Sequence, residues 1–493
     1  MKKLLLCGIL FTTLNIFSQT QLGNNITGVS GGDESGYSVS LSSDGTIVAI
    51  GSPLNDMNGQ DAGLIRVYKF NNGTLSWEQH GNDILGAAAG NQAGYSVNLS
   101  NDGSILAIGE RFNGSNNEGL VRTYSYNTNN NTWEQLGNDI NGASSGDQSG
   151  HSVSLNSDGT IVAIGAPFHN IDNGKVNVFS YNTNTSIWEQ LGSDIIIGNS
   201  SRFGFSVSLS SDGHTLAIGA ISGIEGGSRS GLVQIYTYNT NTDVWEQQGS
   251  TIPGESSNDD SGYSVSLSSD GSIVAIGAPF NNGSGPSSGH VRIYGYDSNS
   301  GDWEQLGNDI DGEFAVDDSG VSVSLSSNGS IVAIGARGSN GLRGQVKIYR
   351  YNNTLEIWEQ LGMNIVGNFD STAGTSVSLS SDGSIVAVGA PHDDDSSAPN
   401  TGYVGVYSIA EILSTNDLSL QETIFYPNPT NNEFTIQLKE GIQLQKAKIY
   451  NQLGQLVKTS TDINTSIHDL SSGIYFVKVY TDLGIFKHKL IIE

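Results

Sequence analysis

One hairpin pattern recurs seven times along this chain, and it limits the folds that the chain can adopt. The first copy reads GYSVSLSSDGTIVAIGSP. Its turn dipeptide recurs at intervals of 58, 56, 54, 58, 58 and 54 residues, at Asp44-Gly45, Asp102-Gly103, Asp158-Gly159, Asp212-Gly213, Asp270-Gly271, Asn328-Gly329 and Asp382-Gly383. In every copy another glycine precedes the turn glycine by nine residues. Because this local spacing is fixed while the period varies, we expect insertions to fall in other loops.

Each repeat contains four predicted β-strands. Residues 38–41 alternate polar and apolar, and we expect the Asp-Gly pair to supply positive φ in a tight hairpin turn. Residues 47–50 are continuously apolar, which predicts a strand buried on both faces. Residues 291–296 illustrate the third strand, which alternates again. The fourth strand is marked by the motif Trp-Glu-Gln, which occurs six times. These six copies account for every tryptophan of the chain: Trp77, Trp133, Trp188, Trp245, Trp303 and Trp358.

Seven units of four strands predict an all-β, seven-bladed β-propeller over residues 19–410. The seventh unit lacks the Trp-Glu-Gln strand. The missing piece has a counterpart at the other end of the chain, because residues 21–26 (QLGNNI) match residues 135–140 (QLGNDI). We therefore expect the N-terminal segment to supply the fourth strand of the last blade. This pairing would close the ring and remove exposed sheet edges.

The first 18 residues have the layout of a secretory signal peptide. Two lysines precede an apolar run that is too short to span a membrane comfortably, and small polar residues follow. We expect cleavage between Ser18 and Gln19. Cys7, the only cysteine, would leave with this segment, which excludes disulfides and thiolate chemistry from the mature chain. No other segment resembles a membrane span, so we expect an exported, soluble and monomeric protein.

Charge and glycine content change near residue 410. Residues 19–410 carry 40 acidic and 12 basic side chains, a balance that makes nucleic acid an unexpected partner. We interpret this charge as a solvated acidic surface. After a linker at 411–420, residues 421–493 contain less glycine and more lysine, and their alternating strands predict a small Ig-like β-sandwich.

The repeats resemble the FG-GAP repeats of integrin α-subunit propellers and their bacterial relatives. The likeness is carried by GYSVSLSSDGSIVAIGAPF with the following GHVRIY, by Phe203-Gly204, and by Gly-Ala-Pro at 165–167, 277–279 and 389–391. The resemblance implies a propeller in which one face meets ligands. Many members of this family bind calcium in the first hairpin, but the positions aligned with those ligands hold Ser40, Ser42 and Val48 beside Asp44. We therefore predict no calcium site there and no cofactor, and we interpret Asp44 as a turn former.

The last segment closely resembles the C-terminal sorting domain of the type IX secretion system of Bacteroidetes-type bacteria. The matching features are the motif Tyr426-Pro427-Asn428-Pro429, the strand that begins at Gly473 and contains Tyr475, and the ending around Lys489. The resemblance implies that the type IX secretion machinery is a partner. It also implies that the protein is released outside the cell or attached to the cell surface.

The sequence assigns no catalytic residue, and its eight histidines show no metal-type spacing. The loops opposite the Asp-Gly hairpins vary and carry acids and amides. We consider these loops candidate ligand contacts, at Asn55, Asp56, Asp172, Asp259, Asp260, Asp317 and Asp318. Asp393, Asp394 and Asp395 are the densest carboxylate cluster and a candidate cation site, although a solvated loop is the favoured interpretation.

We therefore predict an extracellular or surface protein that binds a protein or glycan partner, with adhesion as its role. One alternative is a polysaccharide-acting enzyme, a glycosidase or lyase, on the same scaffold. Another is a structural spacer in a surface layer. Carboxylates gathered at the central funnel would favour the enzyme, and an acid-poor funnel would favour binding.

Overall fold

The computed structural model describes residues 19–198, 201–394 and 398–409, and much of 424–492 except 427, 431, 439–443, 452–455, 469 and 482–483. The chain divides into two compact parts, residues 1–410 and 411–493. The predicted signal peptide and the predicted linker at 411–420 lie outside the described residues. No described helix is long and apolar enough to cross a membrane.

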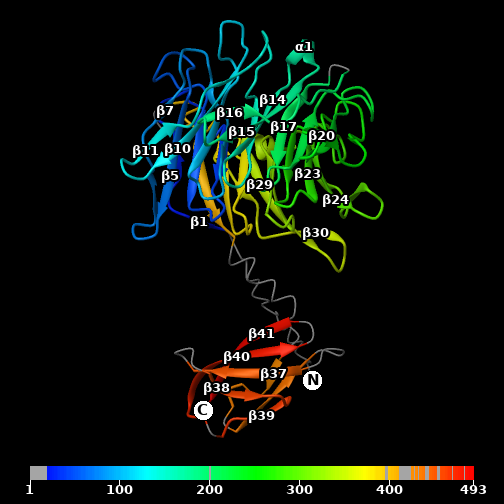
Figure 1. Ribbon diagram of the computed structural model, residues 1–493. Coiled ribbons are helices and arrows are strands. Elements are labelled where there is room, and N and C mark those ends of the chain that lie inside the picture. Colours follow the sequence, from blue (N-terminus) through cyan, green and yellow to red (C-terminus); the bar gives the residue numbers. More distant parts are fainter. Residues whose placement is uncertain are drawn as a thin grey trace, which may run out of the picture. The chain divides into compact units, whose positions relative to one another are not determined.

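The first part contains seven antiparallel sheets, which we number as units 1 to 7 (Figure 1). The first strands of the units are β3 (Ser38–Leu41), β8 (Ala93–Leu99), β13 (Ser152–Leu155), β17 (Phe203–Leu209), β22 (Ser264–Leu267), β27 (Ser319–Leu325) and β32 (Ser376–Leu379). The second strands are β4 (Ile47–Ser52), β9 (Ile105–Glu110), β14 (Ile161–Ala166), β18 (Thr215–Ala220), β23 (Ile273–Ala278), β28 (Ile331–Ala336) and β33 (Ile385–Ala390). The third strands are β5 (Leu64–Asn71), β10 (Leu120–Asn127), β15 (Lys175–Asn182), β19 (Leu232–Asn239), β24 (His290–Asp297), β29 (Gln345–Asn352) and β34 (Tyr403–Ser408). The predicted all-β propeller is confirmed.

The fourth strand differs from the prediction because it is split into two pieces. The longer pieces are β6 (Ser76–Gln79), β11 (Thr132–Gln135), β16 (Ile187–Gln190), β20 (Val244–Gln247), β25 (Asp302–Gln305) and β30 (Ile357–Gln360). The shorter pieces are β7 (Ile84–Leu85), β12 (Ile140–Asn141), β21 (Ile252–Pro253), β26 (Ile310–Asp311) and β31 (Ile365–Val366). In unit 1 both pieces pair with β5, and Gly81, whose φ is +94°, lies between them. A glycine turn thus interrupts a strand that the hydrophobic pattern showed as continuous.

The N-terminal segment completes unit 7, as predicted. Strands β1 (Thr20–Gln21) and β2 (Ile26–Thr27) both pair with β34, in the places that β6 and β7 occupy on β5. Hydrogen bonds also join unit 7 to unit 1. The Ser381 N–H donates to the Ser43 carbonyl at 2.8 Å, and the Ser376 hydroxyl donates to the Gly36 carbonyl at 2.7 Å. The same two contacts occur between each of the other neighbouring units at 2.7–3.0 Å.

The Asp-Gly hairpin is a four-residue loop and not a two-residue turn. The Ser42 N–H donates to the Ile47 carbonyl, and only Gly45 within the loop has a positive φ, at +69°. Asp44 acts through its side chain, because its Oδ1 accepts from the Ser42 hydroxyl at 2.7 Å and the Thr46 N–H at 2.9 Å. The turn-forming role of Asp44 is confirmed, whereas the expectation of positive φ holds for the glycine alone.

The tryptophans join neighbouring units. Each indole N–H donates to a backbone carbonyl of the preceding unit at 2.8–3.1 Å; Trp133, for example, bonds to His80 of unit 1. Trp133, Trp188, Trp245 and Trp303 are buried. The hydrophobic core likewise lies between sheets, as in the cluster that packs Val233 and Ile235 of unit 4 against Val265 and Val274 of unit 5. The repeated tryptophan is therefore architectural.

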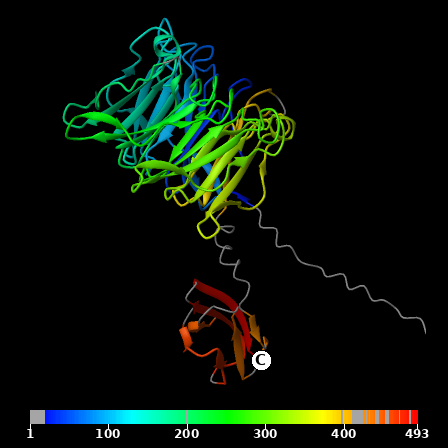
Figure 2. The same ribbon diagram turned by 90° about the vertical axis from the view of Figure 1, so that its right-hand side faces the viewer.

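Two short segments, α1 (His169–Asp172) and α2 (Ser339–Leu342), lie in loops between second and third strands. Their middle residues have left-handed backbone angles, so both are turns more than helices. These loops and the connections between units lie at the end opposite the Asp-Gly hairpins, where parallel bridges such as Gly63 to Ala93 join them. We call this end the loop face. Figure 2 shows the same part turned by 90°.

The C-terminal part is a β-sandwich, as predicted. One sheet contains β35 (Ile424–Tyr426), β36 (Glu433–Gln437) and β39 (Asn464–Ser466). The other sheet contains β38 (Leu456–Ser460), β37 (Leu444–Tyr450), β40 (Gly473–Thr481) and β41 (Gly484–Ile492). Phe434 and Ile436 of the first sheet share a buried core with Val477 and Leu490 of the second.

Candidate ligand-binding site

A row of aromatic side chains borders the loop face. Each occupies the position directly after the glycine that begins a repeat: Tyr37, Tyr95, His151, Phe205 and Tyr263. Neighbouring ring centroids are 4.6–5.1 Å apart, which is contact distance for aromatic pairs. Burial, together with nearby Arg111, lowers the pKa of His151 to about 3, so its ring is neutral at physiological pH. Burial also raises the pKa of Tyr37.

The aromatic row stops at units 6 and 7, where the equivalent residues are Val321 and Thr375. A cavity of about 480 Å³ opens at this gap, and we call it the loop-face pocket. It lies among units 6, 7 and 1. Its lining residues are Tyr37, Val316, Asp318, Arg337, Gly338, Leu342, Asp370, Thr372, Thr375, Pro391, His392 and Asn400. A small side chain at position 375 thus leaves space that a tyrosine fills elsewhere in the row.

Arg337 supplies the permanent positive charge of the pocket. Its Nε–H donates to Asp318 Oδ2 at 3.2 Å, and about a third of the arginine side chain remains exposed. Burial raises the pKa of Asp318, although Arg337 opposes that shift. Arg337 follows the Gly-Ala pair of its repeat, a position that holds proline in units 1, 3, 5 and 7. Unit 2 also has an arginine there, Arg111, so these two units replace the proline of four others with a cation.

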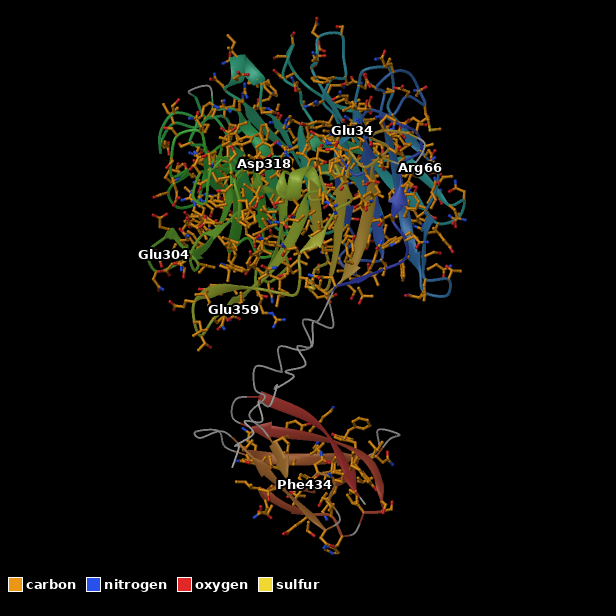
Figure 3. All side chains as sticks on the ribbon, turned by 180° about the vertical axis from the view of Figure 1, so that it is seen from behind. Glu34, Arg66, Glu304, Asp318, Glu359 and Phe434 are labelled. Carbon is orange, nitrogen blue, oxygen red and sulfur yellow. The ribbon has the colours of Figure 1, made fainter. Side chains whose placement is uncertain are left out.

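His392 forms the opposite wall, and both of its ring nitrogens have partners. Nδ1 lies 3.1 Å from the Thr372 hydroxyl, which itself donates to the Ser371 carbonyl, so the imidazole is the donor to Thr372. Nε2 lies 3.5 Å from Glu34 Oε1. Glu34 raises the pKa of His392, and this outweighs the lowering effect of burial. Figure 3 shows Glu34 and Asp318 toward one end of the propeller, with Glu304 and Glu359 toward the other.

The rim of the pocket carries a strained apolar residue. Val316 has a φ of +66° and is 58% exposed. Five of the equivalent positions hold Gly32, Gly90, Gly146, Asn258 and Asp370, residue types that tolerate this conformation, and the sixth is Ser200. A β-branched residue with positive φ costs stability, and such strain concentrates at binding and catalytic sites.

The predicted ligand contacts fall into two groups. Asn55, Asp259, Asp260 and Asp317 are buried and take part in local structure. Asp317, for example, accepts the N–H groups of Phe314 and Glu313 at 3.0 and 3.1 Å, and Asp260 pairs with Arg229 at 2.9 Å. Asp56 is exposed, Asp172 is half-exposed and lies 3.5 Å from Arg202, and Asp318 lines the pocket. A ligand role for these residues stays a prediction, carried furthest by Asp318.

The described residues of the predicted acidic cluster accept hydrogen bonds from the protein, one from the connection between units 6 and 7 and one from their own loop. Asp393 Oδ1 accepts from Asn368 Nδ2 at 2.9 Å, and Asp394 Oδ1 accepts from the Asn400 N–H at 2.9 Å. Asp395 lies outside the described residues. Among the described residues, the group of acids and histidine that could hold a metal lies elsewhere, at Glu255, His290 and Asp309.

A second hollow, of about 180 Å³, lies where the first hairpins converge. Serine, asparagine and leucine line it, among them Ser40, Leu41 and Asn98. The Ser40 hydroxyl accepts from the Leu99 N–H at 2.9 Å, and this bond recurs between each pair of neighbouring units. The side chains around the hollow therefore hold units together.

The described sorting-motif residues belong to the C-terminal β-sandwich. Tyr426 ends β35, Gly473 begins β40, and Lys489 pairs with Phe476 across β40 and β41. Asn428 Oδ1 accepts the Ile491 N–H at 2.9 Å, and Tyr475 is buried with its hydroxyl donating to the Ser471 carbonyl. Pro429 is exposed, and Pro427 lies outside the described residues.

Comparison with known proteins identifies this part of the chain. Residues 424–493 match the family described as "Secretion system C-terminal sorting domain", which confirms the predicted type IX sorting domain. The domain indicates export to the cell surface or extracellular space and interaction with the type IX machinery. The protein is therefore secreted, and its propeller acts outside the cell.

The comparisons say less about the propeller. The search of curated proteins found no match. One similar solved structure is a proposed 6-phosphogluconolactonase from Bacteroides uniformis, with 14% identity and a TM-score of 0.49 over 68% of this chain and 86% of that one. Another is hydrazine synthase from Kuenenia stuttgartiensis, with 15% identity and a TM-score of 0.48 over 73% of this chain and 94% of that one. Likeness at this level carries no argument about activity.

Sequence reasoning missed Arg337, His392, Thr375 and His290. Each lies at a repeat position where most other units carry a different kind of residue. An alignment of the seven repeats would have singled these residues out, whereas a search for acidic loops found groups that serve the fold.

Proposed function

We propose that this protein is a surface or extracellular binding protein whose loop-face pocket receives the end of a polar glycan. The observation that carries the proposal is the gap in the aromatic row at Thr375, which opens a cavity of about 480 Å³ beside Tyr37, Arg337 and His392. Small-ligand sites have volumes of roughly 300–1,000 Å³ and combine apolar walls with a few polar groups.

The lining chemistry suits a sugar. Val316, Leu342 and Pro391 offer apolar surface, while Asp318, Asp370 and Asn400 offer hydrogen-bond acceptors. Arg337 and His392 supply donors, and each already pairs with an acid, so the pocket carries little net charge. A neutral or weakly charged saccharide would exchange many weak hydrogen bonds with such a wall.

Two further features support binding. The resemblance of the repeats to FG-GAP propellers implies that ligands meet one face, and the pocket lies on the loop face. In addition, the residues that line the hollow at the hairpin end include no aspartate or glutamate. An acid-poor centre fits recognition better than hydrolysis, which depends on a pair of positioned carboxyl groups.

The test is binding of the purified protein to a glycan array and to matrix proteins, with calcium and with chelator, while the same glycans are assayed for cleavage. Arg337→Ala removes a charged donor, for which we expect a roughly 10- to 100-fold loss of affinity. Thr375→Tyr restores the residue type of units 1, 2 and 5 and should block the pocket without unfolding the propeller. Arg350→Ala, near the other end of the same unit, is the matched control.

Each outcome distinguishes one hypothesis. Saturable glycan binding that Thr375→Tyr abolishes and Arg350→Ala preserves would support the proposal. Cleavage of a bound glycan would favour the alternative of a polysaccharide-acting enzyme, with Asp318 and Asp370 as the first acids to replace. Binding to matrix proteins alone would indicate a protein partner, and binding to none would favour the structural spacer.

A further inference from the structure

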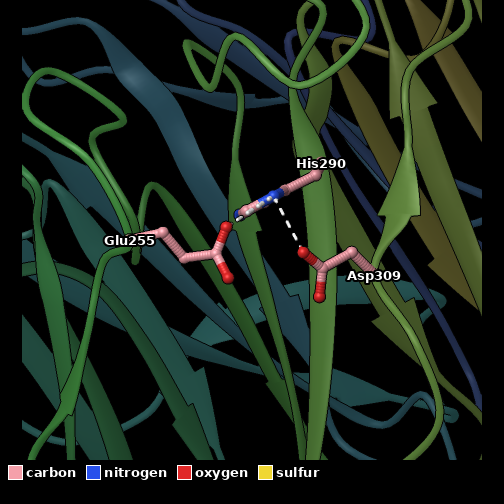
Figure 4. A group of neighbouring side chains, drawn as sticks. All are labelled: Glu255, His290 and Asp309. Atoms are coloured by element: carbon pink, nitrogen blue, oxygen red, sulfur yellow. Dashed lines mark ion pairs between the residues drawn. The ribbon is translucent and has the colours of Figure 1, made fainter.

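A buried imidazole faces two carboxylates between units 4 and 5. His290, the first residue of β24, is 1% exposed. Its Nδ1 lies 3.7 Å from Asp309 Oδ2 and 3.9 Å from Glu255 Oε2 (Figure 4). Glu255 lies on the connection between units 4 and 5, and Asp309 directly precedes β26. Three different segments therefore direct nitrogen and oxygen atoms toward one point, and these atoms all lie within 4.8 Å of one another.

The polar atoms of this cluster lack the hydrogen bonds that buried groups normally make. His290 Nε2, Arg292 Nε and Asp259 Oδ1 are buried without a hydrogen-bond partner. The separations from Nδ1 to both carboxylates also exceed hydrogen-bond length. A buried polar group left without a partner costs roughly 1–3 kcal/mol, so several in one place point to a missing ligand.

The other units show how the same position is filled when no ligand is needed. Units 1, 2 and 4 place a buried leucine there, as Leu64, Leu120 and Leu232. Unit 6 places Gln345 there, and its Oε1 accepts from Asn364 Nδ2 at 2.9 Å, where Asn364 is the counterpart of Asp309. In unit 6 the counterparts of Arg292 and Glu255, Lys347 and Glu313, pair directly at 2.8 Å. Unit 5 alone combines imidazole, two carboxylates and no hydrogen bonds among them.

Charge also favours a cation at this point. Four acids, Glu255, Asp259, Asp309 and Asp311, surround the cluster, and the one arginine beside them is Arg292. Its Nη2 donates to the Pro253 carbonyl at 2.7 Å, and its Nη1 lies 3.6 Å from Glu255 Oε1, which leaves Glu255 Oε2 directed at His290. The acids therefore outnumber the arginine, and a bound cation would offset the excess negative charge.

We propose that Glu255, His290 and Asp309 form a binding site for a divalent first-row transition-metal cation of the Zn²⁺ class, with water completing the coordination. One imidazole nitrogen and two carboxylate oxygens suit such an ion, whereas Ca²⁺ and Mg²⁺ prefer oxygen ligands alone. Ligand atoms around tetrahedral zinc are about 3.3 Å apart, so the two distances from His290 Nδ1 would shorten by about 0.4 and 0.6 Å, and no pair of ligand atoms would need to close by more than about 1.5 Å.

The surroundings fit this role. The Gln305 Nε2 donates to Asp309 Oδ1 at 2.7 Å, which leaves Oδ2 directed at His290 and orients the carboxylate as an outer-shell partner does. The side chains of Glu255 and Asp309 are 42% and 28% exposed, so an ion can enter from solvent. A bound ion would fasten the connection around Glu255 to the outer strands of unit 5.

The test uses the purified protein, prepared without a histidine tag and stripped with chelator. Zinc binding is measured by calorimetry and by metal content after dialysis, and Co²⁺ absorption reports the coordination. His290→Leu, which restores the residue of units 1, 2 and 4, should weaken zinc binding at least 100-fold. Glu255→Ala, at an exposed position whose counterparts before units 2 and 3 are Ala87 and Ala143, should weaken it at least tenfold. The matched control is Asp139→Asn, the same exchange as Asp309→Asn made at the equivalent position of unit 2.

We expect one zinc per chain, a cobalt spectrum of low coordination number that His290→Leu abolishes, and unchanged binding in Asp139→Asn. Zinc binding that is equal in the original protein, His290→Leu and Glu255→Ala would overturn the proposal. Equal displacement of zinc by calcium would also overturn it, because an oxygen-only surface site would then account for the binding. If His290→Leu does not fold, Glu255→Ala still tests the proposal, because Glu255 is at an exposed position.

Discussion

Gly219→Ala should destabilise the propeller strongly, because Gly219 lies at a close approach between two units. A Cβ at this position would stand 2.1 Å from the Gly262 carbonyl oxygen of unit 5 and 2.4 Å from Ser206 Oγ. Real Cβ contacts essentially never fall below 3.0 Å, so the sheets would have to separate by about 0.9 Å. The Ser206 hydroxyl would also lose its 2.8 Å bond to the Gly262 carbonyl. Overpacking costs roughly 1–3 kcal/mol and the hydrogen bond about 1 kcal/mol, so we expect a loss of about 2–4 kcal/mol.

The assay is guanidinium unfolding followed by tryptophan fluorescence. All six tryptophans lie between residues 77 and 358, so the signal reports the propeller and not the sorting domain. Gly198→Ala is the control, because no atom lies within 4 Å of its added Cβ and the residue is exposed. We expect this control to change stability by less than about 0.5 kcal/mol. An unfolding midpoint for Gly219→Ala equal to that of Gly198→Ala would refute the argument that close approach requires glycine.

Four further predictions concern the pocket, the turns and the contacts between units. Val316→Gly should raise the stability of the propeller by about 1 kcal/mol, measured by chemical unfolding, and lower glycan affinity, because it relieves the strained φ and removes apolar surface at the rim. Glu34→Gln should lower the pKa of His392, which NMR titration measures. Because Glu34 raises this pKa in the folded state, the Glu34–His392 pair contributes its full stability below about pH 6.5 and loses it as pH rises through the folded pKa. Burial raises the pKa of Asp102, but hydrogen bonds from Ser104 and Ser100 outweigh this effect and lower it. The stability that Asp102 contributes is therefore present above about pH 3.9 and is lost as pH falls through the folded pKa. Asp102→Asn should make the melting temperature less dependent on pH in this acid range while keeping the turn, as Asn328 does in unit 6. Trp133→Phe should cost about 1–2 kcal/mol in unfolding followed by circular dichroism, because the His80 carbonyl loses its indole donor; an unchanged stability would contradict the structural role of this bond.

The sequence predicted the repeated parts of the fold and missed the parts that depend on one unit. Strand order and the N-terminal pairing with unit 7 followed from spacing and from matched ends, and the sorting domain followed from its resemblance to a known family. The split of the outer strand at Gly81 did not, because two short strands on one partner give the same hydrophobic pattern as one long strand. The sequence also did not distinguish loop acids that stabilise the fold from loop acids that line a pocket. Asp317 and Asp318 are neighbours in sequence, yet one caps a buried loop and the other lines the pocket.

The pocket and the metal cluster both lie where one unit differs from the residues that several other repeats have at the same position. Three units have leucine at the position of His290, five have an aromatic residue at the position of Thr375, and four have glycine or asparagine at the position of Val316. Each of these three departures is locally unfavourable: His290 Nδ1 faces two carboxylates beyond hydrogen-bond length, Thr375 leaves a cavity, and Val316 strains the backbone. Conflicts between local preference and fold concentrate at functional sites. A ligand that fills the cavity or coordinates the nitrogen would remove part of that cost, which is why we place binding at these departures and not at the repeated acids.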